Sequence, residues 1–276
     1  MANGHIRHDV EFFDSGKAES TDKSKTITIP SDLFEKLYLP HTQHVVSTPK
    51  PKHTFGNPTP IALAGILIAL TPLACVLMGW RGAGGGGASG TAAYFFFGGL
   101  LSVLSGVLEW VLGNSFASIV YCSYGAFFLT LGGTLTPAFF AFDAYAPAGE
   151  NPSAGLETTG FNAGFGFFFL WMAVLSFVFL ICSVRTNVCF FIVFLTLTFC
   201  YSFLAGAYWM LAADFEGNAN SAGSLVHAAG GSAFITCLAA WWVFLSSMLA
   251  VVDFPFQLPV GDLSRFIKGA SQKSMV

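Results

Sequence analysis

From position 58 to position 251 the chain is apolar almost without interruption, and short polar turns divide this stretch into six runs. Each run is long enough to cross a bilayer as a helix, which takes about 20 apolar residues. The runs do not alternate apolar and polar residues, as the strands of a membrane barrel do. Charged residues make up 10% of the chain, against about 25% in a soluble domain. We therefore predict an all-α, polytopic membrane protein with six transmembrane helices.

The polar interruptions set the bounds of the predicted spans. These spans are 58–80, 91–112, 116–141, 160–183, 188–212 and 222–251. The loop Gly82–Gly90 consists almost entirely of Gly, Ala and Ser, and we expect no helix there. Pro137 is expected to kink the third helix near its end. Two pairs of small residues, Ser102/Gly106 and Gly160/Gly164, predict close helix contacts within or between protomers.

Three regions follow from this pattern. Residues 1–54 are polar and are predicted to form a largely disordered N-terminal tail. Residues 55–253 form the six-helix transmembrane domain, and residues 254–276 form a polar C-terminal tail. Because the number of spans is even, both tails lie on one side of the membrane.

The basic residues indicate which side this is. Lys50, Lys52, Arg185 and Arg265 flank the spans on the side of the tails, whereas only Arg81 lies on the opposite side. Lys and Arg gather in the cytoplasmic loops of membrane proteins. We therefore predict that both termini are cytosolic.

A distinctive stretch precedes the first span. Asn57 is a favoured helix cap, Pro58 suits the first helical position, and Pro60 still lies in the first turn. A capped helix N-terminus offers N–H donors and partial positive charge to a small anion. The simpler interpretation is that Asn57 only caps a helix and the two prolines only fix its direction.

Two residues inside the spans are candidates for function. Glu109 is the only plainly ionisable side chain well inside an apolar run, and such an acid is a functional hypothesis by default. A partly solvated structural hydrogen bond to the Asn114 turn is an equal alternative to a proton-linked transport role. Tyr124 lies in the middle of a span, with Thr130 farther along. A phenol in hydrocarbon needs a partner, so a helix contact and a pore-lining role remain open.

The sequence offers little for other kinds of function. It contains no phosphate-binding loop, zinc-protease motif or nucleophile–base pair. The six cysteines have no metal-ligand spacing. We therefore predict no enzyme activity, no metal, no cofactor and no nucleic-acid partner.

Several short motifs carry a family resemblance. FGNPTPIAL at 55–63 resembles the NPAPLGL signature of the acetate uptake transporter family, whose bacterial members are called succinate–acetate permeases. Further similar blocks are FGG at 97–99, GVLE at 106–109, GNSF at 113–116 and SYG at 123–125. The ending FPFQLP at 254–259 is similar to that of fungal members. The resemblance covers about residues 55–260 in order.

The resemblance implies a structure and a site. It implies six-helix protomers assembled into hexamers, each protomer with its own narrow acetate path. Ile66, Tyr124 and Leu197 align with a hydrophobic constriction, although Ile66 stands where the family has Phe. Ala240 aligns with a small residue that influences substrate size. The helix start and the same resemblance make Asn57, Pro58, Pro60 and Tyr124 candidate substrate-binding residues, and Thr130 is a further candidate because it lies farther along the helix of Tyr124.

The function implied is plasma-membrane transport of acetate and other short-chain monocarboxylates, coupled to protons, by a homo-oligomer in contact with membrane lipid. Moving a bare carboxylate into a low-dielectric region costs tens of kcal/mol in the Born limit, and a co-transported proton removes most of that cost. Two alternatives stay open. One is transport of ammonia or ammonium, which has been linked with the family. The other is a membrane acetate sensor whose cytosolic tail signals.

Overall fold

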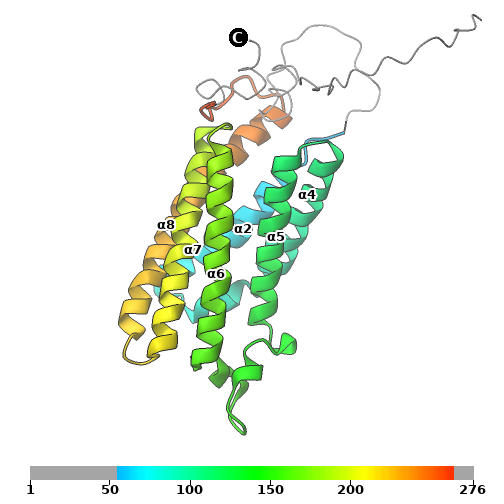
Figure 1. The fold of residues 1–276 in the computed structure, drawn as a ribbon. Coiled ribbons are helices and arrows are strands. Elements are labelled where there is room, and N and C mark those ends of the chain that lie inside the picture. The colour runs from blue at the N-terminus through cyan, green and yellow to red at the C-terminus, as the bar shows by residue number, and fades with distance from the viewer. Residues whose placement is uncertain (1–54, 264–276) are drawn as a thin grey trace, which may run out of the picture.

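The computed structural model describes residues 55–263 and forms a bundle of long helices in that part of the chain (Figure 1). Six spans are long and apolar enough to cross a membrane, which confirms the predicted all-α fold class. They are α2 (Thr59–Leu77), the continuous run of α3 (Thr91–Ala93), η3 (Tyr94–Leu101) and α4 (Ser102–Val111), α5 (Ser115–Leu135), α6 (Thr159–Ser183), α7 (Val188–Ala213) and α8 (Ala219–Val251). The predicted tail 1–54 and the end of the C-terminal tail lie outside the described residues.

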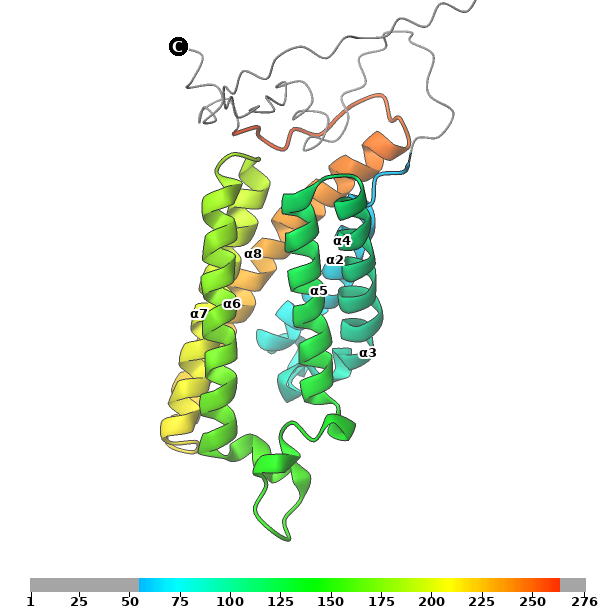
Figure 2. The ribbon, with the colours of Figure 1, turned by 45° about the vertical axis from the view of Figure 1, so that its right-hand side comes forward.

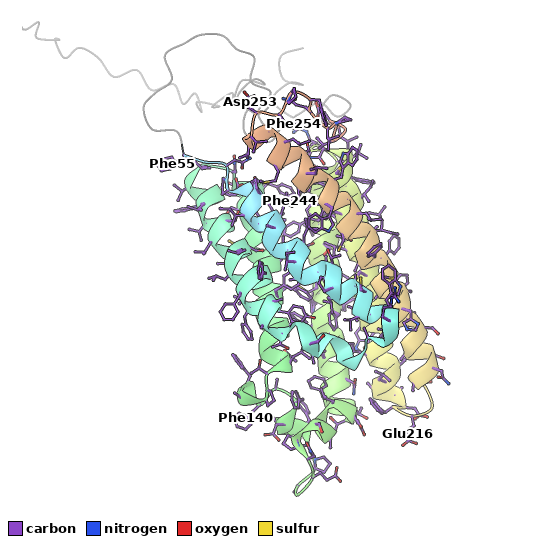
Figure 3. The ribbon with its side chains drawn as sticks, turned by 180° about the vertical axis from the view of Figure 1, so that it is seen from behind. Phe55, Phe140, Glu216, Phe244, Asp253 and Phe254 are labelled. Carbon is purple, nitrogen blue, oxygen red and sulfur yellow. The ribbon has the colours of Figure 1, made fainter. Side chains whose placement is uncertain are left out.

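Both ends of the described chain lie at the same end of the bundle, as an even number of spans requires (Figure 1). Figure 3 shows Phe55 and Asp253 at this end and Phe140 and Glu216 at the opposite end. The turns after α4 and α6 also lie at the end with the termini, whereas the longer loops after α2, α5 and α7 lie at the other.

Two details of the predicted loops are wrong. Pro137 does not kink the third helix: α5 ends at Leu135, and Pro137 begins a separate 3₁₀ turn, η4 (Pro137–Phe139). Proline has no N–H to donate, so the first turn of a new helix suits it better than a helix interior. The glycine-rich loop contains two 3₁₀ turns, η1 (Trp80–Gly82) and η2 (Gly85–Gly90). The Tyr94 hydroxyl donates to the Gly87 carbonyl at 2.8 Å and fixes this loop.

Small residues let the first three spans approach closely, including segment η3, which has π-helical hydrogen bonding. A Cβ on Gly65 of α2 would lie 2.5 Å from the Phe97 carbonyl oxygen of η3. One on Gly106 of α4 would lie 2.5 Å from the Cys122 sulfur of α5. The predicted close contact at Ser102/Gly106 is therefore confirmed within the protomer, whereas Gly164 faces open space.

The bundle consists of two halves. One contains α2, η3, α4 and α5, and the other contains α6, α7 and α8. Figure 2 shows α6 and α7 standing apart from α4 and α5 while α8 crosses behind them, and Figure 3 shows α2 and α8 side by side. Between α5 and α6 the space is filled by rings: Phe127 stacks on Phe168 at 6.0 Å, and Tyr124 meets Phe179 edge-on at 6.0 Å. The backbones of the two halves thus approach closely along α2 and α8, whereas between α5 and α6 the halves are in contact through aromatic side chains.

The first part of the predicted C-terminal tail lies against the bundle. We name residues 254–263 the C-terminal strap. The indole N–H of Trp242 donates to the Pro259 carbonyl at 2.9 Å, and the Val188 N–H donates to the Gly261 carbonyl at 2.8 Å. Asn187 and Asp262 form an antiparallel bridge. The strap therefore joins the end of α8 to the start of α7.

Candidate functional site

An apolar cavity of about 40 Å³ lies where the two halves meet. Its walls come from α2, α5, α7 and α8, and its lining is mostly aliphatic and aromatic. The lining residues are Leu63, Ile66, Leu70, Val120, Tyr121, Tyr124, Phe128, Phe190, Val193, Phe194, Leu197, Tyr201, Thr236 and Ala240. A water molecule needs roughly 10–15 Å³ by the same kind of measure, so the cavity suits a molecule of only a few heavy atoms.

Helical periodicity explains why these side chains converge. On α7, Phe190, Phe194, Leu197 and Tyr201 recur at intervals of three or four residues and form one stripe. Leu63, Ile66 and Leu70 form a similar stripe on α2. The cavity lies where the two stripes face each other across the seam between the halves.

The structure brings the residues of the predicted constriction together. Ile66, Tyr124 and Leu197 come from α2, α5 and α7, and all three line the cavity. Ala240 of α8, predicted to influence substrate size, lies in the same lining. Tyr124 is 5% exposed and Leu197 is also 5% exposed. Their action as a gate stays a prediction.

Hydroxyl groups beside the cavity are tied to the protein. The Tyr124 hydroxyl lies 2.9 Å from the Ser176 hydroxyl, which donates to the Met172 carbonyl at 2.8 Å. The Thr196 and Thr236 hydroxyls lie 2.6 Å apart, each also within hydrogen-bond reach of carbonyls of its own helix. The helix contact expected for Tyr124 is thus present together with its place on the cavity wall.

Glu109 anchors a hydrogen-bonded cluster at the end of the bundle where the termini lie. The Thr59 hydroxyl donates to Oε1 at 2.6 Å and the Asn114 amide donates to Oε2 at 2.6 Å. Nearby, the Ser105 hydroxyl donates to the Pro58 carbonyl at 2.7 Å. The predicted bond to the Asn114 turn is confirmed. The expected partial solvation is wrong, because Glu109 is 0% exposed.

The residues before α2 lie outside the cavity. Helix α2 begins at Thr59 rather than at Pro58, and Oδ1 of the exposed Asn57 accepts the Thr59 N–H at 3.0 Å. Pro58 and Pro60 are buried in the packing around the first turn. Thr59 therefore connects Asn57 at the surface with the buried carboxylate of Glu109.

Thr130 does not join the other predicted site residues. Its side chain is exposed, and its hydroxyl donates to the Ala126 carbonyl of its own helix at 2.8 Å. Six residues along a helix correspond to a rotation of roughly 240°. Thr130 therefore points to a different side of α5 from Tyr124.

Some cavity residues were not found from the sequence. The sequence patterns did not identify Ser176, whose hydroxyl lies within hydrogen-bond distance of Tyr124. They also did not identify Tyr201 and Thr236, which line the cavity. The α7 stripe offered a signal, because Tyr201 lies four positions after Leu197 on the same helical face. Within residues 55–263, no three His, Cys, Asp or Glu side chains gather as a metal site would require.

The chain is similar to known proteins along most of its length. The model of the GPR1/FUN34/yaaH family matches residues 41–265. Protein alcS of Aspergillus fumigatus is 41% identical over 254 residues, covering 92% of this chain and 91% of that protein. Acetate transporter protein patA of Aspergillus clavatus is 32% identical over 219 residues, covering 79% and 83%. Ammonia transport outward protein 2 of Saccharomyces cerevisiae is 27% identical over 237 residues, covering 84% and 76%.

A solved structure shares the fold. The structure of the bacterial acetate channel SatP superposes with a TM-score of 0.58 at 22% identity, covering 75% of this chain and all of that one. At this level of identity the likeness concerns the arrangement of the helices.

The Glu109 cluster generates a prediction. Glu109→Ala removes the acceptor of two buried donors, and we expect the free energy of unfolding to fall by about 1–3 kcal/mol. Glu109→Gln should lose much less, because its carbonyl still accepts from Asn114 and the Thr59 hydroxyl can rotate to accept from its amide. Thermal unfolding in mild detergent measures both variants. An alanine variant as stable as the wild type would show that this cluster does not hold the helix ends together.

Proposed function

Since this chain belongs to the GPR1/FUN34/yaaH family, we propose that it carries acetate and other short-chain monocarboxylates across a membrane through the cavity between its two halves. It is an integral membrane transport protein and not an enzyme. The observation that carries the proposal is the small cavity itself, whose apolar wall fits a methyl group and whose size suits a few heavy atoms.

The chemistry of the lining favours proton coupling. Between residues 55 and 263, no acidic or basic side chain lines the cavity. A bare carboxylate entering such a space costs tens of kcal/mol in the Born limit, whereas the neutral acid does not pay this cost. Acetic acid titrates roughly where a Glu side chain does, near pH 4–5. Passage of the acid together with a proton therefore has the lower free-energy barrier.

The constriction supplies selectivity in this proposal. Tyr124, Leu197 and Ile66 face one narrow apolar space, from which water and hydrated ions are excluded without any fixed charge. Ala240 leaves room beside them. Asn57 lies at the termini end of the bundle, which is the cytosolic end in this proposal, and its exposed amide contacts the substrate at that mouth of the path.

The proposal includes a setting in the cell. Arg185 lies at the end with the termini, whereas Asp143, Glu150, Asp214 and Glu216 lie in loops at the other end. This distribution supports cytosolic termini by the positive-inside rule, and we place the protein in the plasma membrane. The open space beside Gly164 offers a face to a second copy, so we include a homo-oligomer, a hexamer by family resemblance. Its mass in mild detergent should be a multiple of 29.4 kDa.

Ammonia is the second candidate substrate, and the similarity to ammonia transport outward protein 2 of Saccharomyces cerevisiae favours it. A small neutral molecule also fits an apolar cavity. Ammonium would instead need acceptors around its charge. Methylammonium flux measured beside acetate uptake in a transporter-null host separates the two substrates.

Uptake into proteoliposomes tests the proposal directly. With the purified full chain, labelled acetate should accumulate when the outside is made acidic, because the gradient supplies protons. Accumulation should disappear when an ionophore removes the gradient. Empty liposomes under the same gradient provide the control for passive entry of the neutral acid. Uptake no greater than that of empty liposomes would contradict acetate transport.

Leu197 tests the constriction. Leu197→Ala removes three heavy atoms from one wall, so larger acids such as lactate or succinate should compete with labelled acetate more strongly. Leu195→Ala, on the same helix but outside the cavity lining, is the matched control. Competition is normalised to the amount of protein at the surface. If both variants lose abundance with unchanged selectivity, Leu197 acts only in packing, where such a cavity costs about 2–5 kcal/mol.

A substitution of Asn57 tests the contact with the carboxylate at the cytosolic mouth of the path. Asn57→Asp keeps the oxygen that caps Thr59 but adds a negative charge, so acetate uptake should fall strongly while the protein still reaches the membrane. Asn57→Ser keeps a cap without the charge and should retain most uptake. Wild-type uptake in the aspartate variant would exclude Asn57 from the path.

A further inference from the structure

A hydrogen bond between the two halves fixes one residue of the constriction. The Tyr124 hydroxyl of α5 lies 2.9 Å from the Ser176 hydroxyl of α6. Ser176 is fully buried, yet no residue of α6, which the structure describes in full, belongs to the cavity lining. The phenol oxygen of Tyr124 is therefore directed towards α6, whereas its ring forms part of the cavity wall.

Ser176 is itself held in place by its own helix. Its hydroxyl lies 2.8 Å from the Met172 carbonyl, one turn earlier in α6. A serine or tyrosine hydroxyl both donates and accepts, so the contact gives the Tyr124 oxygen a partner whichever of the two hydroxyls donates. The position of the phenol oxygen is thus tied to α6, on the far side of the seam between the halves.

The ring of Tyr124 is restrained by other rings. It meets Phe179 of α6 edge-on at 6.0 Å and stacks on Phe194 of α7 at 6.4 Å. These contacts position the carbon atoms of the ring, but a buried phenol also needs a polar partner for its oxygen. Ser176 supplies the polar contact that Phe179 and Phe194 cannot.

The direction of this hydroxyl matters for what the cavity accepts. A narrow neck excludes hydrated solutes without fixed charge only while its wall is apolar. A substrate hydroxyl that enters such a space loses its water without gaining a partner, which is unfavourable. Without Ser176, the Tyr124 hydroxyl would find its partner in the cavity and would offer a hydrogen bond to a hydroxylated substrate there.

We propose that Ser176 is a positioning residue for substrate selectivity. By binding the Tyr124 hydroxyl on the side of α6, it keeps the constriction apolar and makes the path discriminate against acids that carry an additional hydroxyl group. Ser176 does not touch the substrate and acts through Tyr124 alone. This inference rests on the proposed transport of monocarboxylates and adds a class of acid that such transport disfavours.

Lactate and propionate provide the measurement, because they differ by one hydroxyl group on the carbon next to the carboxyl group. Each is used to compete with labelled acetate for uptake into proteoliposomes that contain the full chain. The ratio of their half-inhibitory concentrations, lactate over propionate, does not depend on the amount of folded protein. We expect Ser176→Ala to lower this ratio by about three- to tenfold, as the gain of one hydrogen bond to lactate implies.

Two further variants show whether the effect passes through Tyr124. Ser183 lies two turns after Ser176 on α6, is also fully buried, and donates to the Leu180 carbonyl of its own helix at 2.7 Å. Ser183→Ala is therefore the matched control and should leave the ratio unchanged. Tyr124→Phe removes the oxygen on which Ser176 acts, so adding Ser176→Ala to Tyr124→Phe should change the ratio no further.

The possible outcomes separate this inference from the proposed function. An unchanged ratio in Ser176→Ala, with acetate still transported, overturns the inference alone. An equal shift in Ser183→Ala, or a shift caused by Ser176→Ala in the Tyr124→Phe background, also overturns it, because the effect then does not depend on the Tyr124 hydroxyl. A wild-type protein that carries no acetate overturns the proposed function and this inference with it.

Discussion

Polar groups inside a membrane protein must find their partners within the protein, because hydrocarbon offers none. Thr130, Thr134 and Thr198 meet this requirement by donating to the carbonyl four residues earlier in their own helices. Glu109 meets it with a hydroxyl from α2 and an amide from the α4–α5 turn. This constraint accounts for a cavity that stays apolar although hydroxyl groups lie beside it, because those hydroxyl groups bond to one another and to backbone carbonyls.

The cavity exists because the two halves are joined in two different ways. Along α2 and α8, small residues bring the backbones together: a Cβ on Gly230 would lie 2.9 Å from the Leu77 side chain. Between α5 and α6, rings such as Phe127 and Phe168 hold the helices farther apart. The cavity lies beside this ring-filled seam and is lined by α2, α5, α7 and α8. The phenylalanines of the bundle thus serve both as an exposed apolar surface and as internal spacers between the two halves.

Much of the fold could be predicted because hydrocarbon allows few alternatives to a helix: the span predicted at 160–183 is observed at Thr159–Ser183. The contacts of Glu109 were only half predictable. Asn114 is five residues away, but Thr59 is fifty residues away and is brought close only by tertiary packing. The strap was missed for a similar reason, because it contributes backbone carbonyls such as those of Pro259 and Gly261 to these hydrogen bonds, and backbone carbonyls carry no sequence signature. Family resemblance placed Ile66, Tyr124, Leu197 and Ala240 in one lining, whereas Thr130, chosen for its closeness in sequence, fell on another face.

Helix α8 has 33 residues, which corresponds to a length of roughly 50 Å, well beyond the roughly 30 Å of hydrocarbon in a bilayer. It crosses the bundle obliquely, and a helix of this length in a thinner layer must lean or protrude (Figure 2). The same helix carries Thr236 and Ala240 on the cavity wall and Trp242 against the C-terminal strap. Any change in the tilt of α8 therefore moves the cavity wall and the strap together. The thickness of the surrounding bilayer, which sets that tilt, thus influences the width of the transport path.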